Sequence, residues 1–132
     1  MDTLEQMQVK AFLNQARPET EIAQLENSVK RLRGYLDIAR SMGANASGDG
    51  VERYATLVQE YVGELEARAA EVRAVISQVP NETQRRILEC RYLDGMTIEQ
   101  TADRLLYCVK NINYHHRHAL ESVKTILDRN DT

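Results

Sequence analysis

Several residue types are scarce in this chain, and each scarcity excludes a class of protein. The 132 residues contain no Trp, one Phe, two Pro and two Cys. So few cysteines argue against a disulfide scaffold, and we expect Cys90 and Cys108 to be reduced thiols. No run approaches the roughly eighteen apolar residues of a membrane span, and the polar start Met1–Gln6 is not typical of a signal peptide. These absences predict a cytoplasmic protein with no membrane partner.

Basic residues are not in excess either. The chain has 17 Lys and Arg against 20 Asp and Glu, a formal net charge of −3. Because nucleic-acid-binding domains usually carry a basic surface, any binding of a polyanion has to be local. Glycine-rich phosphate loops, HExxH motifs and nucleophile elbows are missing as well. We therefore expect no enzyme, no cofactor and no metal centre, which leaves binding as the class of function.

The scarcity of Pro and Gly predicts an all-α fold made of long helices. A capping box of Thr3 and Gln6 predicts a first helix that ends before Pro18. From residue 20 to 42 apolar residues recur at spacings of three and four, and after a Gly-rich loop at 43–50 the same rhythm continues to residue 79. We expect residues 20–79 to form a long antiparallel helical hairpin, with Asp49 and Glu52 capping its second arm.

The second arm of this hairpin has more apolar surface than one facing helix can cover. The additional positions are Ala55, Leu57, Val62, Ala67, Ala70, Ala74 and Val75. The first helix, the C-terminal domain or a second copy of the chain would each cover it, and the favoured interpretation is a homodimer through the hairpin. The alternative is that the alanines are simply good helix formers on a solvated face.

Beyond Pro80 the expected helices become short, which predicts a domain boundary between residues 1–79 and residues 80–132. N-caps are expected at Asn81 and Thr97, with a helix stop at Asp94-Gly95 between them. A short helix then leads through the turn 106–108 into a longer helix, an arrangement that can place the second helix in the DNA major groove. The expected inner face of the longer helix is Val109, Ile112, Ala119, Leu120, Val123 and Leu127.

This last helix lies in the longest acid-free run of the chain, seventeen residues between Asp103 and Glu121. Its expected outward residues are Lys110, Asn113, Tyr114 and Arg117. Asn can read adenine, Lys and Arg reach guanine or phosphate, and a Tyr hydroxyl bonds phosphate, so double-stranded DNA is the predicted partner. The alternative is an ordinary solvated face that happens to be basic.

Three histidines, at 115, 116 and 118, raise the question of a metal site. No CxxC or HxxxH pair accompanies them to complete one. The favoured interpretation is that His115 or His116 is a packed, hydrogen-bonded core residue, while the others add pH-dependent positive charge near DNA.

The stretch from Val79 to Leu127 resembles region 4 of the sigma-70 family, the domain that binds the upstream promoter element. The residues that carry this resemblance are Pro80, the run Arg86–Thr97, Ile98–Gln100, Ala102, Leu105, Ile112 and Ala119-Leu120. Through the segment Ala11–Arg17 and the charged coil after it, the whole chain resembles short phage or prophage regulators of the ArpU-like type.

The resemblance implies a sigma region 4-like helix-turn-helix domain in a DNA-binding transcriptional regulator, with RNA polymerase as a further partner. Lys110, Asn113 and Tyr114 would then face base edges, with Arg117 and Asn111 near the DNA backbone. The chain departs from the family pattern at Leu106, where Gly or a polar residue is usual, and at Cys108, where a Ser or Thr cap is usual. It also has Thr101 and His115 where aliphatic residues are expected, which leaves sequence specificity open.

Two other functions fit the same elements. Small terminase subunits also combine helix-turn-helix domains with helical hairpins, although they generally put the DNA-binding domain first. A module that docks on RNA polymerase without reading DNA is the other alternative. Nothing in the chain resembles the sigma domains that melt the promoter, so it is not a complete sigma factor.

Overall fold

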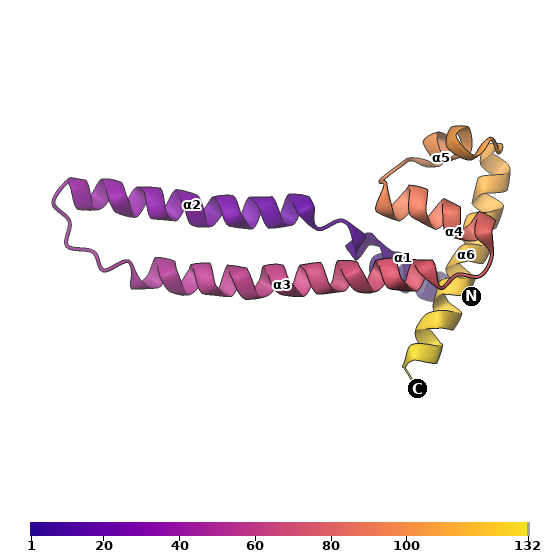
Figure 1. The fold of residues 1–132 in the computed structure, drawn as a ribbon, viewed down its shortest axis with the longest axis horizontal. Coiled ribbons are helices and arrows are strands. Elements are labelled where there is room, and N and C mark those ends of the chain that lie inside the picture. Colours follow the sequence, from indigo (N-terminus) through magenta and orange to yellow (C-terminus); the bar gives the residue numbers. More distant parts are fainter. Residues whose placement is uncertain (132) are drawn as a thin grey trace. The chain divides into compact units, whose positions relative to one another are not determined.

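The computed structural model describes residues 1–131, and in that range every regular element is a helix (Figure 1). The elements are α1 (Thr3–Leu13), the 3-10 turn η1 (Asn14–Ala16), α2 (Glu19–Ser41), α3 (Asp49–Ser77), α4 (Glu82–Leu88), the π-helical turn η2 (Glu89–Leu93), α5 (Ile98–Leu105) and α6 (Val109–Asn130). The prediction of an all-α protein is confirmed. Among the described residues, no helix has the length and apolar character needed to cross a membrane.

The chain divides into two compact units, and the division does not follow the predicted domains. One unit comprises Pro18–Ala67, and the other comprises Met1–Arg17 together with the chain from Arg68 onward. The boundary therefore falls inside α3 rather than at residue 79. The apolar rhythm of α3 runs unbroken from one unit to the other, so the sequence carries no signal at the point where the packing partner changes.

In the unit of residues 18–67, α2 packs against the first part of α3. Its core is formed by Val29, Ala55, Val58 and Val62, with Ile22, Leu25 and Tyr54 packed against it. Side-chain hydrogen bonds join the same helices as well. Ser28 Oγ lies 2.9 Å from Tyr54 Oη, and the Arg33 guanidinium donates two hydrogen bonds to the Glu52 carboxylate. The Tyr61 hydroxyl donates to Glu21 Oε1 at 3.1 Å.

The prediction that Asp49 and Glu52 cap α3 is wrong. Asp49 is the first residue of the helix and does not cap it, and Glu52 pairs with Arg33 instead. The helix begins two residues before Val51, directly after Gly48, which has a positive φ of 81° and whose carbonyl accepts from the Glu52 amide.

In the other unit, α1 packs with the end of α3, with η2 and with α6. The buried residues of this core are Val9, Leu13, Ala16, Val72, Val75, Ile76, Val79, Leu88, Tyr92, Ala119, Leu120, Val123 and Ile126. The capping box of α1 is formed by Asp2 and Glu5, not by Thr3 and Gln6. Asp is the stronger N-cap, and its use moves the start of the helix by one residue.

A smaller core joins α4, α5 and α6 through Ile87, Ala102 and Ile112, with Ile98 and Leu105 packed against it. The predicted N-caps at Asn81 and Thr97 are confirmed, the second as a complete capping box with Gln100. Between α4 and α5 the chain takes the π-helical turn η2, which the sequence did not predict. This turn directs Tyr92 into the larger core, where it is buried.

Two residues of this unit hold left-handed backbone conformations and give opposite predictions. Gly95 has φ 69° and lies under the guanidinium of Arg17, where a Cβ would clash; Leu106 has φ 61° and is 89% exposed. Gly95→Ala should lower the free energy of unfolding by about 1–2 kcal/mol, and Leu106→Gly should raise it by about 1 kcal/mol. Urea unfolding followed by circular dichroism measures both changes. A change of the same sign in the two variants would contradict the left-handed conformation of one of the two residues.

Candidate nucleic-acid interface

The connection between α5 and α6 is a turn of three residues. The chain reverses at Leu106, and the amides of Leu106 and Tyr107 both donate to the carbonyl of Ala102. Cys108 returns to extended backbone, and its carbonyl accepts the first bond of α6, from the Ile112 amide. The turn thus leads the chain out of α5 and directly into the start of α6.

One face of α6 holds the helix in place. Ile112, Ala119, Leu120, Val123 and Ile126 are at most 2% exposed. Four of these residues belong to the inner face expected from the sequence, and Ile126 was not expected there. Leu127, which was expected to be buried, is only partly buried. Val109 is the exception: it was expected to face inward, but it is 40% exposed and belongs to no core. As the first residue of α6, it lies beyond the reach of the small core of α4 and α5.

The five predicted DNA-binding residues are all exposed on α6. They are Lys110, Asn111, Asn113, Tyr114 and Arg117. At about 100° per residue, four of them fall within an arc of about 100° opposite the buried face, and Asn111 lies to one side of that arc. The helix thus brings together two cations, an amide and a phenol on one outward surface.

The cations of this surface are not neutralised. Lys110, Arg117 and the neighbouring Arg104 make no ion pair within the described part of the chain. The cations of α4, in contrast, pair with carboxylates of their own helix or of η2: Arg86 with Glu82 at 3.2 Å, and Arg85 with Glu89 at 3.7 Å. Sequence reasoning had not listed Arg104 as a candidate, although the acid-free run contains it.

The beginning of α6 adds positive potential. Cys108 makes no side-chain hydrogen bond to the helix, and the first turn contains no acidic residue. The first amides of a helix have no partner within it, and the helix dipole places partial positive charge there. An anion is therefore favoured at this end.

Aromatic side chains order the rest of the surface. The Tyr114 ring lies edge-on to two histidines, with centroids 5.3 Å from His115 and 4.6 Å from His118. His118 in turn lies 3.5 Å from the Glu121 carboxylate, and His115 contacts Tyr107. Tyr114 is nevertheless 55% exposed, so its hydroxyl stays accessible. No group of three potential metal ligands occurs within residues 1–131.

His116 is the packed, hydrogen-bonded histidine expected at this point of the sequence, although it is half-buried at the edge of the core. It stacks on Tyr92 of η2 with centroids 5.8 Å apart, and its Nε2 lies 2.9 Å from the Tyr92 hydroxyl. Burial, followed by the nearby charges of Arg91 and Lys10, lowers the pKa of His116 from 6.5 to about 4. At neutral pH the ring is therefore uncharged, and the hydrogen bond between its Nε2 and the Tyr92 hydroxyl holds α6 against η2.

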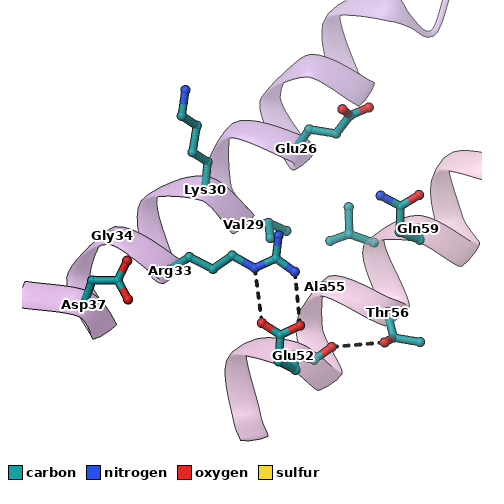
Figure 2. Close-up of a pocket in the computed structure, with 11 residues that line it drawn as sticks. Glu26, Val29, Lys30, Arg33, Gly34, Asp37, Glu52, Ala55, Thr56 and Gln59 are labelled. Carbon is teal, nitrogen blue, oxygen red and sulfur yellow. Dashed lines mark hydrogen bonds and ion pairs between the residues drawn. The ribbon is translucent and has the colours of Figure 1, made fainter. Parts of the chain in front are cut away.

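A groove lies between α2 and α3, well separated in the sequence from the residues of α6. It has a volume of about 710 Å³ and an apolar floor that includes Val29 and Ala55. Figure 2 shows Arg33 of α2 reaching across to Glu52 of α3, with Glu26, Lys30 and Asp37 along the same edge. The charges of this groove are mixed and its Arg33 is already paired, so it does not suit a polyanion.

No protein-family model, curated protein or solved structure matches this chain. The functional assignment therefore depends on the residues of α5, the turn and α6.

Protonation of His116 predicts that acid destabilises the protein. Between pH 6.5 and pH 4 the unfolded chain binds more protons than the folded one, so the free energy of unfolding falls as the pH drops through this range. The loss is about 3 kcal/mol at most. Urea unfolding at several pH values measures the slope, which His116→Gln should remove and the matched control His118→Gln should keep. An unchanged slope in His116→Gln would show that another group causes the acid sensitivity.

Proposed function

We propose that this chain is a DNA-binding transcriptional regulator, without catalytic activity, that places α6 in the major groove of double-stranded DNA. The observation that carries this proposal is the outward surface of α6. There Lys110 and Arg117, which form no ion pair with any residue of 1–131, flank Asn113 and Tyr114 in a protein that is net acidic. The seventeen residues from 104 to 120, which contain no carboxylate, suit contact with a polyanion.

In this proposal α5, the turn and α6 act as a helix-turn-helix in which α6 is the recognition helix. Asn113 reads an adenine, Lys110 reaches a guanine edge or a phosphate, and Tyr114 and Arg117 bond phosphate oxygens. Asn111, to one side of the arc, suits a backbone contact. The free amides at the start of α6 offer a further phosphate contact. The resemblance of residues 79–127 to sigma region 4 supports the same assignment.

We further propose that the unit of α2 and α3 acts as an antiparallel helical hairpin that joins two copies of the chain. Large apolar side chains are exposed on it, each between 57% and 82%: Tyr35 and Ile38 from α2, Met42 just after α2, and Leu57 from α3. A dimer supplies two recognition helices, which compensates for the weak electrostatic attraction of an acidic protein to DNA. Sedimentation that finds only monomer at micromolar concentration would rule this out. Contact with RNA polymerase, which the resemblance implies, stays a prediction.

Two substitutions on α6 test the proposed DNA binding. Selection from a pool of random duplexes with the purified protein first identifies a bound sequence. Lys110→Ala and Arg117→Ala should each weaken binding to it about tenfold at moderate salt, and together they should lower the slope of log affinity against log salt by about two.

The matched control is Arg31→Ala, which removes an exposed cation of α2. It should leave both the affinity and the salt slope unchanged. The proposal that α6 contacts the DNA is wrong if both α6 variants bind the selected duplex as tightly as the parent protein does.

A further inference from the structure

Val109 is an apolar residue in an unexpected place. It opens α6 and is 40% exposed, although the next apolar residue of the helix, Ile112, is completely buried. The small core of α4, α5 and α6 does not include it. Its exposed methyl groups, beside the exposed Lys110 and Asn113, are therefore accessible to an apolar group outside the protein.

The position of Val109 on α6 links it to the proposed base-reading residues. It lies four residues before Asn113, so the two side chains are neighbours on one flank of the helix, about 6 Å apart along its axis. Lys110, the next residue, is exposed and forms no ion pair with the residues that the structure describes. Val109 is thus the aliphatic neighbour of a surface whose members are two cations, an amide and a phenol.

We propose that Val109 reads a thymine, through contact of its methyl groups with the C5-methyl group of that base in the major groove. Thymine recognition rests on the DNA binding proposed above and adds the identity of one base. Thymine is the only base that presents a methyl group in the major groove, and an aliphatic side chain is the chemistry that recognises it. The cations beside Val109 and the carboxylate-free stretch favour DNA over an apolar protein partner as the occupant.

The spacing also predicts where this thymine lies. An axial distance of about 6 Å along α6 spans at most about two base-pair steps of B-DNA. The thymine that Val109 contacts should therefore lie within about two base pairs of the adenine that Asn113 reads. That adenine is the position at which Asn113→Ala loses discrimination between bases.

Deoxyuridine tests the contact, because it differs from thymidine only by the missing methyl group. Each thymine of the selected duplex is replaced in turn and the affinity is measured. One replacement, within two base pairs of the adenine, should weaken binding of the parent protein about fourfold, as expected for one buried methyl group. Val109→Ala should bind the thymine and deoxyuridine duplexes equally well, and Val109→Ile should still discriminate between them.

Leu106→Gly is the matched control, since it removes an exposed apolar side chain from the turn and leaves α6 intact. It should keep the discrimination between thymine and deoxyuridine; its loss would indicate a general apolar patch and overturn the assignment to Val109. Equal binding of every deoxyuridine duplex by the parent protein overturns it as well. Failure of DNA binding itself is recognised separately, by the absence of any selected sequence.

Discussion

The burial of one face of α6 is the constraint on which the rest of this structure depends. Five apolar residues from Ile112 to Ile126 are almost completely removed from water, against partners from α1, α3, α4, η2 and α5. Once that face is fixed, helical geometry decides which residues point outward. The hydrogen bond between Tyr92 and His116 then fixes α6 against η2. The cationic surface is therefore held on a rigid element, as recognition of a fixed ligand shape requires.

Local signals in the sequence predicted a large part of this arrangement. The caps at Asn81 and Thr97 depend on side chains bonding amides three residues away, and such short-range chemistry survives in almost any tertiary context. The outward direction of Lys110, Asn113, Tyr114 and Arg117 also followed from helical periodicity, because their helix is long and strongly amphipathic.

What could not be predicted depends on contacts between distant segments. The change of partner along α3 leaves no trace in its apolar rhythm, and the burial of Tyr92 requires the π-helical turn η2. Val109 fits the inner-face pattern by spacing alone, yet the core ends before it reaches the start of α6. The N-cap of α1 was predicted one residue too late, at Thr3 instead of Asp2. Both residue types are good N-caps, so the sequence pattern alone does not show which of them starts the helix.

The central claim is that the start of α6 enters DNA, and the two cysteines allow a direct measurement. Cys108 is exposed immediately before α6, while Cys90 is buried and burial raises the pKa of its thiol. Alkylation of the protein with iodoacetamide, with and without saturating selected duplex, is followed by mass spectrometry. The account predicts that the duplex slows alkylation of Cys108 strongly and leaves that of Cys90 unchanged. Equal alkylation of Cys108 in the saturated complex would contradict it.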